Sequence, residues 1–210
     1  MNKVVVIGTG PGTEEYMTPI GREAISQADL VVGGKRLLDT FAMSHQEQWV
    51  IGADLQDITH RIAEQYQVRN IAVLVSGDTG VFSFADYLAR HIDQEALQFI
   101  PGISSVQVMF ARLQKSWVNA QILSVHGREA GVVADVVANS PITAIVTGRP
   151  WFPAKLAAHI LTVHPQLERC AVSVGVDLGY QYEKLIHTVL GELATSEEHL
   201  ENSVMVIMHE

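Results

Sequence analysis

Short apolar runs, each leading into a turn and then a helical pattern, constrain the fold of this chain more than any other feature. Such runs occur at Lys3–Ile7, Leu30–Val32, Ile71–Val75 and Leu97–Ile100. The first and third are continuous rather than alternating with polar residues, which predicts strands buried on both faces. Strands that alternate with helices predict a parallel, doubly wound sheet in the first half of the chain.

The helices expected between these strands have recognisable starts. Thr18 and Pro19 predict an N-cap and a first helical residue, for a helix that runs to about Ala28. Further helices are expected at about 55–67, at 82–92 and after Pro101-Gly102.

The second half of the chain has a different pattern. The polar segment Gln114–Asn119 is the expected boundary, so the predicted domains are 1–113 and 120–210. Turn-rich segments separate the last three strands, which favours a mixed sheet with antiparallel pairs. The strands are expected at 121–125, 142–147, 171–174, 185–189 and 204–208, and the helices at 131–138 and 153–163.

Composition excludes several classes of protein. Hydrophobic residues make up 48% and charged residues 18%, which excludes a disordered chain. The net charge of −9 argues against a general binder of nucleic acid or of anionic membranes. The single cysteine, Cys170, excludes an internal disulfide and a cysteine-only metal site, and we expect no metal. Because neither a signal peptide at Met1–Gly8 nor a membrane-spanning stretch is found, a cytoplasmic protein is expected.

The loop Gly8-Thr9-Gly10-Pro11-Gly12 follows the first strand, where a dinucleotide fold would place its glycine motif. The third glycine of that motif would stand at position 13, which is Thr13, and Pro11 removes a backbone N–H. A nicotinamide-dependent oxidoreductase therefore fits poorly. A simple glycine-rich turn remains open, but a backbone that approaches a ligand explains the loop better.

Two further turns follow apolar strands. Ser76–Phe82 carries Asp78, which could bind a ribose or an amino group or could cap the next helix. Pro101–Ser105 ends in Ser104 and Ser105, which could also be caps or ligand contacts. Open α/β sheets bind ligands at the carboxyl ends of their strands, where these turns lie.

Together these turns resemble the tetrapyrrole methylase family, whose members transfer methyl groups from S-adenosylmethionine. The elements GGKRLL (33–38) and HGR (126–128) are most similar to the branch that methylates carbon 5 of a corrin precursor, precorrin-6Y or cobalt-precorrin-7, in cobalamin synthesis. Further similar elements cover nearly the whole chain: GTGPG (8–12), SGD (76–78), PGISS (101–105), VHGR (125–128), VTGRP (146–150) and DLGYQYE (177–183).

The resemblance implies two α/β domains, a mostly parallel N-terminal one and a mixed C-terminal one, with the ligand cleft between them. It also implies a homodimer. Because the chain ends at Glu210, we expect a stand-alone enzyme without the decarboxylating C15-methylase domain of fused relatives, although a truncated fusion would look the same. The resemblance places S-adenosylmethionine against Thr9, Gly77, Asp78, Val81, Ser104, Ser105 and Thr147.

The substrate of such an enzyme carries acetate and propionate groups, so cations in loops after strands are candidates to bind it. Gly10, Pro11 and Gly12 would line the same cleft. The base is not identified by the sequence; His126 is a weak candidate, because a near-neutral pKa suits proton transfer, but a structural or substrate hydrogen bond is the favoured role for it. A methylase of another tetrapyrrole position and a tetrapyrrole carrier remain alternatives. The candidate cations, which could instead be ordinary surface charges, are Lys35, Arg36, Arg128 and Arg149.

Overall fold

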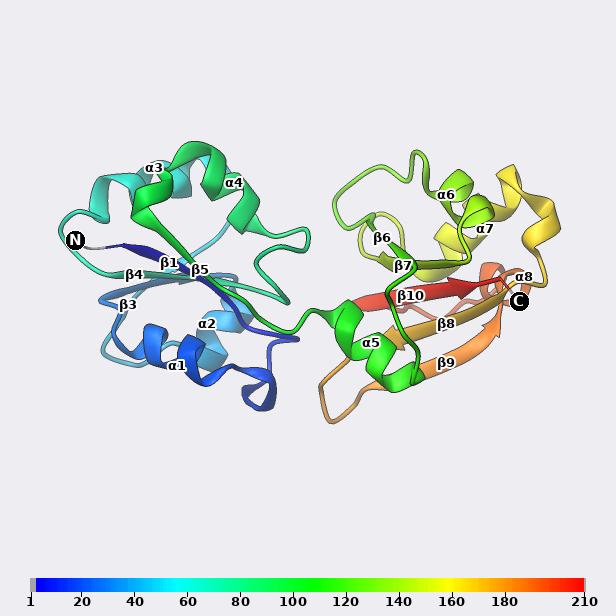
Figure 1. Cartoon of the computed structure of the whole chain (residues 1–210), viewed down its shortest axis with the longest axis horizontal. Coiled ribbons are helices and arrows are strands. Elements are labelled where there is room, and N and C mark those ends of the chain that lie inside the picture. Colours follow the sequence, from blue (N-terminus) through cyan, green and yellow to red (C-terminus); the bar gives the residue numbers. More distant parts are fainter. Residues whose placement is uncertain (1–2, 210) are drawn as a thin grey trace. The chain divides into compact units, whose positions relative to one another are not determined.

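The computed structural model describes residues 3–209, which divide into two compact units between Ser104 and Ser105 (Figure 1). Met1, Asn2 and Glu210, which the predicted domains include, lie outside the described residues. The boundary expected at 114–119 comes one helix later than the observed division. The reason is that helix α5 (Ser105–Leu113) packs on strands β7 (Ile142–Val146) and β10 (Ser203–Met208) of the second unit.

The first unit contains the predicted parallel sheet. Within the described residues its strands lie in the order β3-β2-β4-β1-β5, and each neighbouring pair is parallel. Helices α3 and α4 cover one face and α1 and α2 the other (Figure 1). The elements are β1 (Val4–Gly8), η1 (Glu14–Tyr16), α1 (Pro19–Ser26), β2 (Leu30–Gly33), α2 (Lys35–Phe41), β3 (Glu47–Val50), α3 (Leu55–Gln65), β4 (Ile71–Val75), α4 (Phe84–His91), η2 (Gln94–Ala96) and β5 (Leu97–Ile100).

Burial on both faces explains the continuous apolar runs. Val4 and Val6 of β1 belong to the core under α3 and α4, whereas Ile7 belongs to the core over α1 and α2. A polar residue at any of these positions would be buried on one side or the other. The start of α1 is also as predicted, because the Thr18 side chain accepts a hydrogen bond from Gly21 N and Pro19 is the first helical residue.

The second unit contains a mixed sheet, as predicted. Within the described residues the strands lie in the order β6-β7-β10-β8-β9; β6 and β7 are parallel, and the other neighbours are antiparallel. Val174 and Val176 face the core that α6, α7 and α8 cover, while Gly175 between them meets Met109 of α5 on the opposite face. The remaining elements are β6 (Ala120–Ser124), α6 (Val133–Asn139), α7 (Pro153–Val163), η3 (Pro165–Leu167), β8 (Ala171–Val176), β9 (Lys184–Val189) and α8 (Leu190–Ala194).

The topology of each sheet gathers its loops at one edge. In the first unit the loops after β1, β2, β4 and β5 share the carboxyl edge of the parallel sheet. In the second unit the ends of β6, β7 and β8 meet the beginnings of β9 and β10, since Ser124 pairs with Val146, and Val176 pairs with Ser203 and Lys184. The sequence-predicted site residues lie at these two edges. Among the described residues, none of the helices has the length and apolar character needed to cross a membrane.

Candidate functional site

The loops after β1, β4 and β5 touch through their backbones. A Cβ atom added to Gly102 would lie 2.3 Å from Gly77 O and 2.5 Å from Gly8 C. A Cβ atom added to Gly8 would lie 2.6 Å from Gly102 N. No side chain fits at these two positions, so their glycines are required for packing of the three loops, whatever ligand binds nearby.

Hydrogen bonds join the first two of these loops. Thr9 donates both its N–H and its hydroxyl to Val75 O, at 2.9 and 3.0 Å. Gly10 and Gly77 exchange backbone hydrogen bonds of 3.1 and 2.6 Å, with both glycines at positive φ. Thr9 is completely buried, so its side chain holds the loop from within.

Asp78 links the second loop to the third. Its Oδ1 accepts from Gly80 N at 2.8 Å and its Oδ2 accepts from Gly102 N at 3.0 Å. The alternative that Asp78 caps the following helix is wrong, because Ser83 is the N-cap of α4 and accepts from Ala85 N. Asp78 is only partly buried, and each oxygen of its carboxylate has a further lone pair. The carboxylate can therefore also accept hydrogen bonds from a ligand.

The other residues predicted to contact S-adenosylmethionine are divided between the two units. Val81 N donates to Asp78 O at 3.4 Å, and a Cβ atom on Gly77 would lie 3.5 Å from the Cα atom of buried Ser104. Ser105 is the first residue of α5 in the second unit. The first unit therefore brings Thr9, Gly77, Asp78 and Ser104 to one edge of its sheet.

Lys35 and Arg36 were expected in a loop, but both lie in the first turn of α2. Gly34 precedes them as the N-cap residue, and the helix continues through an apolar face that includes Leu37 and Leu38. Arg36 Nη1 donates to Pro11 O at 3.1 Å, which joins two of the predicted substrate positions. Lys35 pairs with Asp39 one turn along the same exposed helix face.

In the second unit, Thr147 stands after β7 much as Thr9 stands after β1. Its N–H and hydroxyl donate to Ser203 O, at 3.0 and 2.9 Å, and the hydroxyl also lies 2.6 Å from Ser203 Oγ. Thr147 is 2% exposed, so its side chain is likewise turned into the protein.

His126 lies on the exposed edge of the second unit, against Gly148. A Cβ atom added to Gly148 would lie 2.1 Å from His126 Nδ1, so the missing side chain makes room for the imidazole. Gly127 N donates to Arg149 O at 3.0 Å and thereby joins the loops after β6 and β7. His126 thus lies in the loop that carries Arg128 and against the loop that carries Arg149.

The two arginines of this edge are exposed. Arg128 N donates to Val125 O at 3.3 Å. Arg149 Nη2 lies 3.5 Å from Glu201 Oε1, which also accepts from His199 at 3.0 Å. The hydrogen bond from His199, together with the positive charge of Arg149, holds the pKa of Glu201 below its ordinary value.

The ion pair between Glu183 and Arg112 at this edge was not predicted from the sequence. Glu183, at the end of the loop between β8 and β9, accepts from the guanidinium of Arg112 on α5. The sequence singles out 177–183 as a motif, but nothing local indicates a partner 71 residues away.

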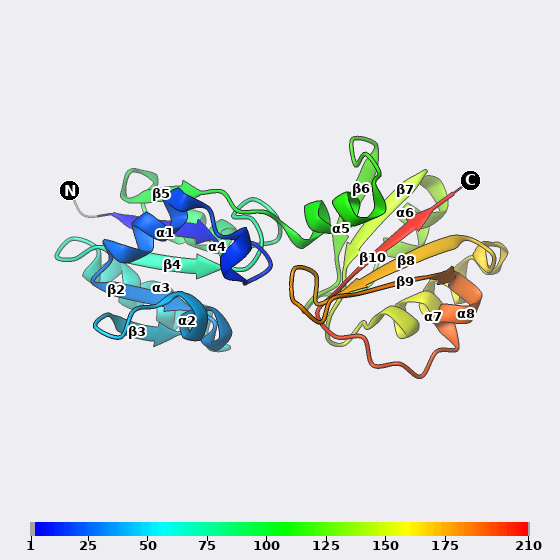
Figure 2. The same cartoon turned by 90° about the horizontal axis from the view of Figure 1, so that it is seen from below.

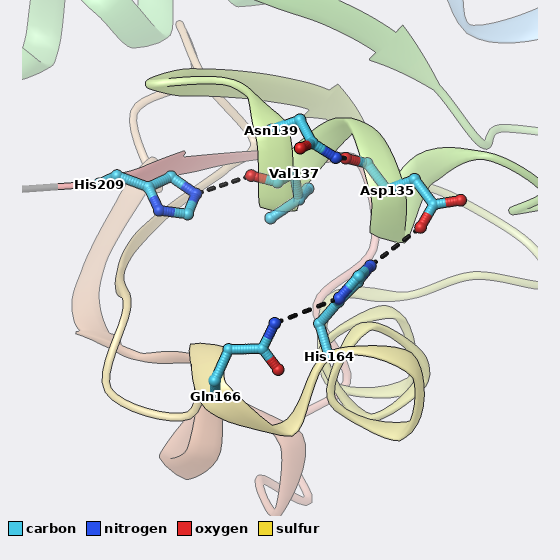
Figure 3. A network of polar contacts seen from close by, with 6 residues as sticks. All are labelled: Asp135, Val137, Asn139, His164, Gln166 and His209. Carbon is cyan, nitrogen blue, oxygen red and sulfur yellow. Dashed lines mark hydrogen bonds and ion pairs between the residues drawn. The ribbon is translucent and has the colours of Figure 1, made fainter.

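The opposite edge of the second sheet carries a separate polar network (Figure 3). His164 Nε2 lies 2.9 Å from Asp135 Oδ1, Gln166 Nε2 lies 3.3 Å from His164 Nδ1, and His209 lies against α6. The network joins α6 to the end of α7. It is placed where β7 begins and β10 ends, away from the candidate loops.

Comparisons with known proteins cover the whole chain. Residues 3–194 match the family model described as Tetrapyrrole (Corrin/Porphyrin) Methylases. The cobalt-precorrin-7 C(5)-methyltransferase of Salmonella typhimurium is 34% identical over 158 residues, which are 75% of this chain and 77% of that protein.

Solved structures share the fold. The precorrin-6Y methylase from Archaeoglobus fulgidus matches with a TM-score of 0.74 and 20% identity, over 99% of this chain and 98% of that one. A uroporphyrin-III C-methyltransferase from Thermus thermophilus, complexed with S-adenosyl homocysteine, matches with a TM-score of 0.80 and 16% identity, over 99% and 97%. The predicted α/β fold with one parallel and one mixed sheet is confirmed.

Proposed function

Because the chain belongs to the tetrapyrrole methylase family, we propose that it methylates carbon 5 of a corrin precursor in cobalamin biosynthesis, with S-adenosylmethionine as the methyl donor. The 34% identity to the Salmonella typhimurium enzyme, over 77% of that protein, carries the proposal. Relatives from Salmonella typhimurium and Methanocaldococcus jannaschii are named as a cobalt-precorrin-7 C(5)-methyltransferase and a probable one. These names favour the cobalt-containing substrate.

S-adenosylmethionine, when bound, supplies a methyl group on a sulfonium, which is electrophilic without further activation. The loops after β1, β4 and β5 fit such a donor. The partly exposed carboxylate of Asp78 retains lone pairs for a hydroxyl or an ammonium group. We assign donor contacts to Gly77, Asp78, Val81, Ser104 and Ser105, whereas Thr9 and Thr147 hold their loops from inside.

The substrate brings acetate and propionate groups to a protein of net charge −9. Arg36, Arg128 and Arg149 bind these groups, with Lys35 at the start of the same helix as Arg36. Each charge-assisted hydrogen bond contributes about 1.5–3 kcal/mol where it is shielded from water. The segment Gly10–Gly12 positions Arg36, because Pro11 O accepts from its guanidinium.

Orientation is the main task of these residues. A good alignment of the reacting groups can account for about 7–11 kcal/mol of barrier lowering. Where a proton leaves the macrocycle, we assign His126 as its acceptor, because the imidazole lies on the loop edge beside Arg128 and Arg149.

The proposal also includes a homodimer. Sedimentation velocity of the purified chain tests this oligomeric state.

Incubation of the protein with cobalt-precorrin-7 and methyl-labelled S-adenosylmethionine tests the function. We expect the corrinoid to gain the mass of one methylene group and the label. A tetrapyrrole carrier would bind the corrinoid and leave its mass unchanged. Calorimetry adds an independent arm: tight binding of NADH without binding of S-adenosylhomocysteine would contradict the assigned donor.

A further inference from the structure

The loop that joins β8 to β9, residues 177–183, is built as a rigid unit; it is called the tyrosine loop below. Two successive turns form it, with backbone hydrogen bonds from Tyr180 N to Asp177 O and from Glu183 N to Tyr180 O, both at 3.1 Å. Asp177 and Gly179 have positive φ, which produces its sharp turns. In both views the loop runs beside the end of α5 (Figure 1, Figure 2).

Two anchors fix the tyrosine loop to the rest of the second unit. Glu183 accepts from Arg112 Nε at 2.5 Å and from Arg112 Nη2 at 3.2 Å, a geometry with two parallel bonds that is specific and strong. Glu183 Oε2 also accepts from Gly179 N at 2.7 Å. At the other end, Asn202 Nδ2 donates to Asp177 Oδ1 at 2.8 Å, and Asp177 N donates to Asn202 O at 3.1 Å.

The tyrosine loop presents two aromatic rings, and its two carboxylates, Asp177 and Glu183, accept hydrogen bonds from Asn202 and Arg112. The rings of Tyr180 and Tyr182 are stacked, with centroids 5.2 Å apart and planes at 26°. Tyr182 is 63% exposed, which is unusual for a ring held in an ordered loop. The carboxylate of Glu183 is only 15% exposed and is neutralised by Arg112, so it does not repel an anionic ligand.

The tyrosine loop lies at the same edge of the second sheet as the basic loops. The pairing of Val176 with Lys184 and Ser203, and of Val204 with Val146, places the turn after β8 along the row that continues to the loop with Arg149. An exposed aromatic pair and a set of arginines on one edge suit a ligand that is flat, unsaturated and fringed with carboxylates.

We infer that Tyr182, supported by Tyr180, packs its ring on the face of the corrinoid macrocycle, and that Glu183 is a positioning residue acting through Arg112. This inference rests on the proposed function and specifies how its substrate is held. A ring-on-ring contact orients the macrocycle, while the arginines bind its side chains.

Binding of cobyrinic acid, a stable corrinoid with acetate and propionate side chains, tests the inference by equilibrium dialysis. Tyr182→Ala is expected to weaken this binding about tenfold, and Tyr182→Phe to retain it, because the ring and not the hydroxyl makes the contact. Glu183→Gln, which keeps the size of the side chain, should weaken it by a smaller factor. All three variants should bind S-adenosylhomocysteine as the wild type does.

The inference and the proposed function can fail separately. If the wild type methylates cobalt-precorrin-7 and Tyr182→Ala leaves both the KM for it and the cobyrinic acid affinity unchanged, the contact is absent and the function stands. If the wild type binds cobyrinic acid through Tyr182 but methylates no carbon 5, the inference stands and the function fails. A wild type that binds no cobyrinic acid would overturn the inference.

Discussion

At the scale of single residues, Gly8 and Gly102 allow the loops after β1, β4 and β5 to pack against one another. Gly102→Ala is expected to destabilise the protein by about 3 kcal/mol, because its Cβ atom would meet Gly77 O and Gly8 rather than a movable side chain. Gly34→Ala is the matched control, because its Cβ atom would enter open space and its φ of −63° suits alanine. Urea unfolding measures both variants, and equal midpoints would contradict the packing described.

Asp78 carries the second prediction at this scale. Asp78→Ala leaves the N–H groups of Gly80 and Gly102 without their acceptor, and is expected to cost about 1–3 kcal/mol of stability and at least tenfold in S-adenosylhomocysteine affinity.

Ser83→Ala provides the comparison for Asp78→Ala in calorimetry. It removes the N-cap of α4, with a cost of about 1 kcal/mol, from the same chain segment. Its S-adenosylhomocysteine affinity should match that of the wild type. If Asp78→Ala also kept full affinity, Asp78 would be a structural residue alone.

Residue roles are predictable from sequence where the interaction is local. Thr18 and Pro19 start a helix through contacts within four residues, so the local sequence is sufficient to predict where α1 begins. Asp78 has the same local signature as a cap, but its Oδ2 bonds to Gly102, 24 residues away. Only the pairing of β1 with both β4 and β5 brings those loops together.

At the scale of elements, the ion pair between α5 and the tyrosine loop predicts a dependence of stability on pH. Hydrogen bonds from Arg112 hold the pKa of Glu183 below its ordinary value of 4.5, with a further contribution from Gly179 N. A lowered pKa means that the folded state favours the carboxylate, so this stabilisation is complete above pH 4.5 and is lost as the pH falls through the lowered pKa.

Glu183→Gln isolates this contribution. Between pH 7 and pH 3 the wild type should lose more unfolding free energy than the variant does, because only the wild type has a carboxylate to protonate at this position. Thermal or urea unfolding at a series of pH values measures the difference. Parallel curves for the two proteins would show that the ion pair contributes nothing to stability.

Elements with buried apolar runs were predictable, and elements at the surface were less so. β1 and β4 are continuous apolar runs because both faces of their sheet are covered. β3 (Glu47–Val50) is an edge strand with a mostly exposed face, so it has little apolar signature. The helix α2 and the five-residue α8 were also not predicted, since short helices owe their stability to tertiary packing.

At the scale of the whole molecule, the chain consists of two compact units with different sheets, and its division follows packing rather than polarity. The segment 114–119 is polar because it is an exposed turn, whereas the division falls before α5, whose Met109 packs against Gly175 of the second unit. The sequence pattern predicts which residues lie in the loops at the edges of the sheets. It does not predict which hydrophobic core each helix packs on.

The central claim is that this chain transfers a methyl group to carbon 5 of a corrin precursor. Incubation with cobalt-precorrin-7 and S-adenosylmethionine carrying a ¹³C-labelled methyl group, followed by NMR of the isolated product, tests it most directly. We predict a single new methyl resonance that couples to carbon 5 of the macrocycle. A label on any other ring carbon, or an unlabelled corrinoid beside active control enzyme, would contradict the claim.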